Sequence, residues 1–223
     1  MAFGQLAAQE QVGTTPAQAP YENYLHKHAI AIQGGVIGYG LEYAYNLNKN
    51  LNVRLGVNLL TISGISVPYE LDSREVDIIA GADAFNVDLF LEYLPFEKSS
   101  FKLVGGLAYV NNTGGNATIK LKDGLSFGEI ELEPNDVGEI GLKMNYTGIA
   151  PYMGLGFGRA VPKGRVGFGI ELGTYYVGGP DISLSATELF EPTANETEEA
   201  KLEEALSSFA WLPNIKLKIA VRL

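Results

Sequence analysis

The last nine residues of the chain alternate between apolar side chains and polar or small ones. The apolar positions are Ile215, Leu217, Ile219, Val221 and Leu223, and the positions between them are Lys216, Lys218, Ala220 and Arg222. A period of two residues is typical of a β-strand whose two faces meet different surroundings. The sequence therefore predicts a strand over residues 215–223.

The same period recurs in six upstream segments. They cover residues 37–47, 51–59, 85–93, 101–109, 149–158 and 166–176. We expect one more strand within residues 22–34, where Ala29, Ile30, Ala31 and Ile32 precede two glycines. The total is then eight, and single-chain bacterial membrane barrels have an even number of strands.

The predicted connections fall into a short and a long class. The short ones lie at 48–50, 94–100 and 162–164, and the long, polar ones lie at 67–76, 111–143 and 179–210. The second long segment has short alternations of its own, at Ile119 and Leu121 and at Ile130 and Leu132, and can extend a hairpin beyond the membrane. Membrane barrels have short periplasmic turns and long external loops, whereas sandwiches have shorter strands and no such asymmetry. The pattern predicts an all-β fold, an eight-stranded antiparallel up-and-down transmembrane β-barrel with long external loops.

Residues 195–209 follow a different pattern. Asn195 or Thr197 can cap a helix whose first turn is rich in glutamate, and Leu202, Leu206 and Phe209 then fall on one face. We expect one short loop helix here that packs over the barrel rim, with recognition of a partner as its alternative role.

Composition agrees with a single membrane barrel. The chain has 223 residues and no run near the ~18 consecutive apolar residues of a membrane helix. It has 27 Gly, 12 Tyr and no Cys, so disulfides and thiolate metal sites are excluded. Its net charge of −10 argues against nucleic acid as a partner. We expect a flexible lead-in or signal-peptide remnant over 1–21 and the barrel over 22–223.

Charged residues occupy only one face of each predicted strand. An ionised side chain facing lipid near mid-bilayer costs about 2 to 4 kcal/mol for Lys or Arg, so the charged face is assigned to the lumen. The predicted lumen charges are Glu42, Asp88, Glu92 and Glu171 with Arg54, Lys102, Lys216, Lys218 and Arg222. Because the interior of an eight-stranded barrel is barely wider than its side chains, we expect a salt-bridge network that plugs it.

Aromatic residues gather on the opposite, lipid-facing side. They are Tyr39, Tyr43, Tyr45, Tyr93, Phe101, Tyr109, Phe157, Phe168 and Tyr176. Several lie near strand ends, where rings form a girdle at headgroup level. The alternative is the aromatic core of a soluble barrel, whose outer face would carry the charges.

The sequence offers little for catalysis or metal binding. His26 and His28 are the only histidines, and no acidic neighbour completes a metal site. The glycine string at 154–158 lies in a strand and opens no helix, so it is not a phosphate loop. The glutamates of 188–204 favour a solvated, repulsive surface over a cation site. We expect no enzymatic activity, no metal and no cofactor.

Two segments resemble a family of poorly characterised Gram-negative outer-membrane proteins. Residues 85–111 read FNVDLFLEYLPFEKSSFKLVGGLAYVN and are similar to its W-x-P-F-G turn followed by F-R-L-S-G-G-L, with Tyr93 in place of Trp. Residues 149–158, IAPYMGLGFG, are similar to its V-A-P-Y-x-G-x-G-W-G. More distantly the chain resembles small barrels of the OmpA and OmpW type. The resemblance implies an outer-membrane location and no particular activity. Lipopolysaccharide, phospholipid and the outer-membrane assembly machinery are then the expected partners, and a surface ligand stays open.

Four functions remain open from the sequence. The first is a structural or surface-interaction barrel with a plugged lumen. The others are a barrel that transports a small or hydrophobic solute, a soluble lipocalin-like ligand binder, and, as a distant fourth, an enzyme that acts on lipid at the rim.

Overall fold

A computed structural model describes residues 26–71, 74–121, 125–127, 130–132, 137–188 and 195–223. The prediction of a lead-in at 1–21 lies outside the described residues, as do residues 22–25 of the predicted barrel and 189–194 of the glutamate-rich stretch.

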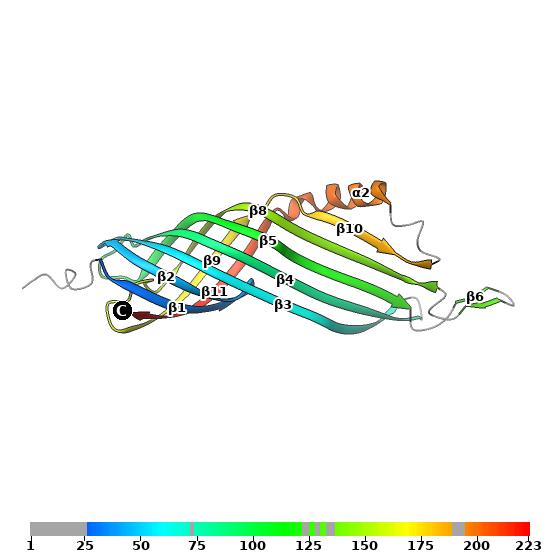
Figure 1. The fold of residues 1–223 in the computed structure, drawn as a ribbon, viewed down its shortest axis with the longest axis horizontal. Coiled ribbons are helices and arrows are strands. Elements are labelled where there is room, and N and C mark those ends of the chain that lie inside the picture. The colour runs from blue at the N-terminus through cyan, green and yellow to red at the C-terminus, as the bar shows by residue number, and fades with distance from the viewer. Residues whose placement is uncertain (1–25, 72–73, 122–124, 128–129, 133–136, 189–194) are drawn as a thin grey trace, which may run out of the picture.

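Eight strands form a closed antiparallel ring. They are β1 (His28–Gly35), β2 (Gly38–Asn48), β3 (Leu51–Leu71), β4 (Arg74–Tyr93), β5 (Phe101–Leu121), β8 (Glu139–Phe157), β9 (Val166–Tyr176) and β11 (Trp211–Arg222). Each pairs with the next along the chain, and β1 pairs with β11 to close the ring. The predicted up-and-down barrel is confirmed, including the strand expected within 22–34 (Figure 1).

The barrel wall is tall on one side and low on the other. Strands β3, β4, β5 and β8 have 19 to 21 residues, whereas β1, β2, β9 and β11 have 8 to 12. A membrane strand needs about 9–11 residues. At about 3.3 Å per residue, the 20 residues of β4 cover about 66 Å, so its outer half stands beyond the bilayer.

This extension corrects the predicted loop at 67–76 and bears out the hairpin extension expected within 111–143. Segments 67–76 and 111–143 are largely strand, because β3 and β4 continue to Leu71 and from Arg74, and β5 and β8 continue to Leu121 and from Glu139. β-bulges occur in β3 between Ile62 and Ile65 and in β5 between Val110 and Thr113. Each bulge shifts the period of two by one residue, which hid the continuing strand in the sequence.

The third long connection contains further elements. Strand β10 (Asp181–Ala186) pairs with the outer part of β8, and helix α2 (Glu196–Leu206) and the 3-10 turn η3 (Ser207–Phe209) lead into β11. A separate hairpin pairs β6 (Leu125–Phe127) with β7 (Ile130–Leu132). The predicted helix is confirmed, and Asn195 caps it by accepting from the amides of Thr197 and Glu198. No helix in the described part of the chain is long and apolar enough to cross a membrane.

Helix α2 covers the outer edge of β10 (Figure 1). A carboxylate oxygen of Glu199 accepts from the amide of Leu184 at 2.7 Å, and one of Glu203 accepts from the amide of Ile182 at 3.2 Å. An edge strand presents unpaired amides that another chain could bind. The two glutamates, four residues apart on one helix face, therefore accept from amides on the edge of β10 that pairs with no further strand of the sheet.

The polarity of the barrel is inverted relative to a soluble protein. Outward apolar side chains such as Ile32, Leu89 and Phe168 are exposed, at 58%, 57% and 74%, while Arg54 and Glu92 are fully buried. Water would oppose both arrangements, whereas lipid around the wall favours both. Most of the predicted girdle is exposed, and only Tyr45 and Phe101 are half-buried. The soluble-barrel alternative therefore fails on burial.

We predict that Leu89→Arg lowers the free energy of unfolding in phospholipid vesicles by about 2 to 4 kcal/mol, because Leu89 faces lipid in the inner half of β4, which lies within the bilayer. Urea titration in vesicles measures this. The control Ser66→Arg lies in the outer extension of β3 and should change stability by about 0.5 kcal/mol or less. Equal effects of the two substitutions would contradict the assignment of the lipid-facing side.

We also predict that Glu199→Ala/Glu203→Ala speeds amide hydrogen exchange at Ile182 and Leu184. The expected factor is about ten or more, because a hydrogen bond to a charged group contributes about 1.5–3 kcal/mol. The control Glu198→Ala/Glu204→Ala removes the same charge and should leave both amides protected. Unchanged exchange in the first variant would show that α2 does not protect this edge.

Candidate functional site

The inward faces of six strands place charged side chains at one level of the lumen. β2 contributes Glu42, β3 Arg54, β4 Asp88 and Glu92, β5 Lys102, β9 Glu171, and β11 Lys216 and Lys218. Every one of these residues is buried. The pairing registers set Glu171 directly opposite Lys216, so charges of opposite sign meet across neighbouring strands.

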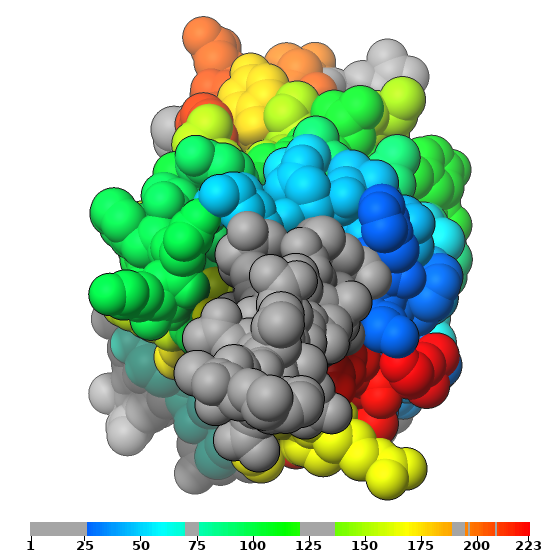
Figure 2. Space-filling view, turned by 90° about the vertical axis from the view of Figure 1, so that its left-hand side faces the viewer, coloured from blue at the N-terminus to red at the C-terminus, as the bar shows by residue number. Residues whose placement is uncertain are grey.

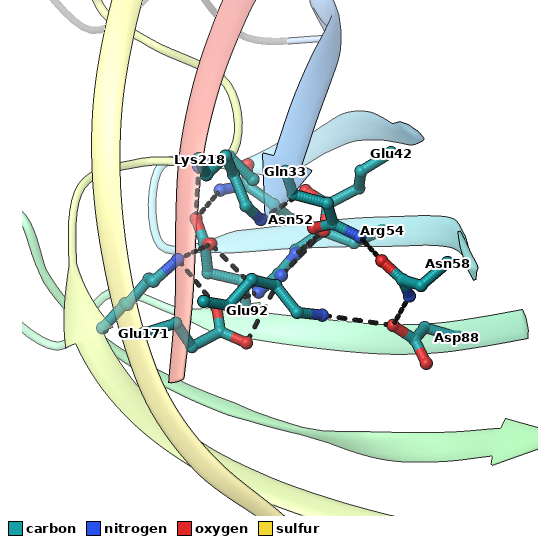
Figure 3. A network of polar contacts seen from close by, with 12 residues as sticks. Gln33, Glu42, Asn52, Arg54, Asn58, Asp88, Glu92, Glu171 and Lys218 are labelled. Atoms are coloured by element: carbon teal, nitrogen blue, oxygen red, sulfur yellow. Dashed lines mark hydrogen bonds and ion pairs between the residues drawn. The ribbon is translucent and has the colours of Figure 1, made fainter. Parts of the chain in front are cut away.

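Arg54 lies at the centre of this layer (Figure 3). Its Nη2 lies 2.7 Å from Glu42, and its Nη1 lies 2.8 Å from Glu171 and 3.5 Å from Glu92. Lys102 Nζ lies 3.2 Å from Glu92 and 2.9 Å from Glu171. Among the described residues, Arg54 thus binds three carboxylates from three different strands.

Lys218 completes the cluster with an ion pair of 2.5 Å to Glu42. We call the six side chains the Arg54 cluster, which comprises Glu42, Arg54, Glu92, Lys102, Glu171 and Lys218. It contains three carboxylates and three cations, so it is neutral, and no side chain in it is more than 3% exposed. A buried ion that loses its partner is strongly destabilising, so each member depends on the others.

A second, smaller group surrounds Asp88. Lys216 Nζ lies 3.2 Å from the Asp88 carboxylate, which also accepts from Asn58 at 2.9 Å and from Asn86 at 2.5 Å. Gln33 donates to Asn58 at 2.6 Å. This group adds one acid and one base, so the described lumen charges number four of each sign.

The amides in these groups were missed by the sequence reasoning. Gln33, Asn46, Asn52, Asn58, Asn86 and Asn214 are all buried in the lumen. Asn52 donates to Glu92 at 2.8 Å and accepts from Asn46 at 2.7 Å. The sequence pattern could have identified these amides, because they occupy the same alternating, inward-facing positions as the charged residues. The prediction for the inward face considered only the charged residues.

The structure corrects the predicted position of Arg222. We expected it in the lumen network, yet its Nη1 donates to the backbone oxygens of Pro162, at 3.3 Å, and Lys163. It lies at the barrel end because β11 ends there, and the β8–β9 turn folds back over that end. Ala160, Val161 and Pro162 of this turn are buried, and the amide of Ala160 donates to Glu92 at 2.8 Å.

An aromatic layer contacts both charged groups. Phe90 stacks on Tyr152 with ring centroids 4.3 Å apart, and Tyr152 contacts Tyr175 at 4.6 Å. Tyr152 also donates to Glu171 at 2.9 Å. A Cβ at Gly173 would lie 2.3 Å from the Tyr152 hydroxyl, so glycine is required there.

Ile37 belongs to this layer and corrects a predicted strand boundary. The strand expected over 37–47 began with Ile37, but this residue lies in the β1–β2 turn and packs against the buried cluster of Phe90 and Tyr175. The turn breaks the alternation one residue before β2 begins.

The two histidines lie apart from these groups. His26 shares a hydrogen bond of 3.1 Å with the Tyr45 hydroxyl, and His28 shares one with the hydroxyl of Tyr43. Within the described residues, no group of three or more His, Cys, Asp or Glu side chains is placed to hold a metal ion.

Comparison with known proteins shows a shared fold. No protein-family model matches the sequence, and no curated protein matches it significantly. The crystal structure of Acinetobacter baumannii CarO2 is similar over 89% of this chain and 99% of its own, at 21% identity and a TM-score of 0.64. That of Acinetobacter baumannii CarO is similar over 86% and 96%, at 23% identity and a TM-score of 0.60. A major outer membrane protein from Thermus thermophilus gives 15% identity and a TM-score of 0.44 over 88% and 99%.

The first two likenesses extend over nearly the whole of both chains. The chain described here therefore shares the fold of CarO and CarO2.

We predict that Arg54→Met destabilises the barrel by about 3–5 kcal/mol, because three buried carboxylates lose a shared cation. Urea titration in vesicles measures the change. Adding Glu171→Gln to Arg54→Met restores the charge balance and should recover part of the loss. A loss below about 1 kcal/mol for the single variant, or no recovery in the double variant, would contradict the interdependence of these charges.

Proposed function

We propose that this protein is a closed, non-enzymatic outer-membrane β-barrel that holds an interaction surface outside the cell. In this proposal the Arg54 cluster plugs the lumen, and the function lies in the outer extension of β3, β4, β5, β8 and β10. The burial of the charge layer is the observation that carries the proposal.

Three packed layers support a closed lumen. The turn residues 160–162 are buried at the short-turn end, the Arg54 cluster contacts them through Glu92, and Phe90, Tyr152 and Tyr175 pack between the Arg54 cluster and the Asp88 group. An eight-stranded barrel has an interior just wide enough for its side chains. Ion pairs of 2.5 to 3.5 Å that are at most 3% exposed fit an interior that water does not cross.

The outer extension supports an interaction role. By register, Ile62, Ile65, Val67 and Tyr69 lie on the face that continues the lumen side, where they pair with Ala82, Ala80, Ile78 and Val76. The four β3 side chains are 40% to 56% exposed, although this part of β3 stands beyond the bilayer. Exposed apolar patches outside a membrane commonly mark interaction sites.

The location and the absence of catalysis are each supported by further observations. The inverted polarity requires lipid around the wall, and the short turns then face the periplasm as in other barrels. The solved neighbours are outer-membrane barrels and not known enzymes. In the described part of the chain, both histidines hydrogen-bond tyrosine hydroxyls and not the serine or acid that a lipid enzyme would place beside them at the rim.

One observation favours a second function, uptake of a hydrophobic compound. The apolar face of the extension continues through Ala82 and Ala84 to the upper lumen, where Val110 and Tyr175 are buried. A compound following this surface would meet the Asp88 group and then the Arg54 cluster, so uptake requires an exit through the low wall formed by β1 and β2.

We predict that the wild-type barrel gives no steady conductance in planar bilayers. The variant Arg54→Ser/Glu171→Ser/Tyr152→Ala removes side-chain volume from two of the three layers and keeps the charges balanced, so it should conduct in discrete steps. The variant Leu89→Ala, on the lipid side, serves as the control and should give no conductance. Large, steady wild-type conductance would refute the closed lumen. A saturable flux of a hydrophobic dye through the wild type would favour uptake.

A further inference from the structure

The short-turn end of the barrel is strongly basic. Lys27, Lys49, Lys98, Arg159, Lys163, Arg165 and Arg222 lie in its turns and strand ends, and Glu97 is the one side-chain carboxylate in the connections 49–50, 94–100 and 158–165. Figure 2 views this end, with the β8–β9 turn (yellow) next to the end of β11 (red). The chain as a whole has a net charge of −10, so the basic character is local.

A pocket lies between the β4–β5 and β8–β9 turns at this end. Its volume is about 280 Å³, and its lining includes Lys98, Ser99, Ser100, Arg159 and Lys163. It is slightly smaller than ligand pockets of about 300–1,000 Å³, so it suits a headgroup better than a whole lipid. Three cations and two hydroxyls are the donors that a phosphate oxygen prefers.

Backbone contacts hold the pocket in shape. The amide of Gly158 donates to the carbonyl of Ser100 at 2.9 Å. Arg159 Nη2 donates to the carbonyls of Glu97 and Ser99 at 3.2 and 3.1 Å, and Lys163 donates to the carbonyl of Glu97 at 3.2 Å. These backbone acceptors position both cations at the pocket.

The electrostatic field at the pocket is positive. The pKa of Glu97, at the edge of the site, lies below its ordinary value. The hydrogen bond from Lys49 is the main cause, and the charges of Lys49, Lys163 and Lys98 add to it. This one exposed carboxylate therefore stays ionised, and cations outnumber it around the pocket.

The pocket opens toward the lipid. Val166 and Phe168 form part of its wall and also face outward, where they are 51% and 74% exposed. Phe157, at the end of the neighbouring strand β8, contacts Phe101 with ring centroids 5.6 Å apart. Aromatic rings at strand ends mark the headgroup level, so cations and an apolar wall meet at the depth of a lipid phosphate.

We propose that this pocket binds the headgroup of an anionic phospholipid in the inner leaflet. The phosphate contacts Lys98, Lys163 and the serine hydroxyls, and the acyl chains lie along Val166 and Phe168. A single basic side chain near a membrane surface contributes about 1 kcal/mol of attraction to anionic lipid, so the converging cations select anionic over zwitterionic lipid.

The experiment counts lipids retained by the intact barrel. Detergent-solubilised protein is titrated with phosphatidylglycerol or phosphatidylcholine and analysed by native mass spectrometry. We expect one phosphatidylglycerol to bind at least about ten-fold more tightly than phosphatidylcholine, and Lys98→Gln/Lys163→Gln to remove this preference. Both lysines are exposed, so the variant should still fold, which its unchanged heat-dependent gel mobility would verify.

The matched control is Lys143→Gln/Lys201→Gln, which removes two positive charges from the outer part of the molecule. This control variant should keep the preference for phosphatidylglycerol. An equal loss of the preference in the control would show that total charge, and not the pocket, causes it, and would overturn the proposal. Competition by inorganic phosphate at the same concentration as the lipid would also overturn it, because the site would then be a free-anion site. Equal binding of phosphatidylglycerol and phosphatidylcholine by the wild type would likewise contradict the proposal.

Discussion

The constraint on which the rest of the structure depends is the neutralisation of charge inside a very narrow ring. Eight strands leave an interior that side chains fill, and water cannot solvate an ion there. Arg54 therefore binds Glu42, Glu92 and Glu171, and Lys102 and Lys218 balance the remaining charge. Such a cluster contributes little net stability compared with a well-packed apolar core, because desolvation offsets most of the attraction. We infer that the cluster instead fixes the register in which the strands pair.

Register matters because each strand has two incompatible faces. A slip of one residue would turn Arg54 into lipid and Leu55 into the lumen, and every paired strand would meet the same conflict. The cluster joins strands that lie on both sides of the ring closure, so one shifted strand removes partners from several others. The folded-back turn at Ala160 adds a backbone donor to the same cluster, through Glu92. The charges, the closure and the short-turn end are thus specified together.

Much of this could be predicted from the period of two alone. Alternation identifies the inward face, and the inward face contains eight of the nine charged residues expected there. The prediction for Arg222 was wrong because alternation indicates which way a side chain points. It does not indicate whether that part of the strand still lies beside the barrel interior. The extension of β3 and β4 was missed, and that of β5 and β8 was visible only as short alternations, because bulges shift the period and because both faces there meet water. The buried amides were missed because asparagine is common in both turns and lumens.

Charge also divides the molecule along the membrane normal. The lumen is neutral and the short-turn end is basic, so the net charge of −10 must come from the outer segments together with the N-terminal stretch. Helix α2 alone contains five glutamates and one lysine. Anionic headgroups would repel such a surface and attract the basic end. The same chain is thus held against lipid at one end and kept away from it at the other. An extension that lipid repels stays accessible from outside, which is the condition that a surface-interaction role requires.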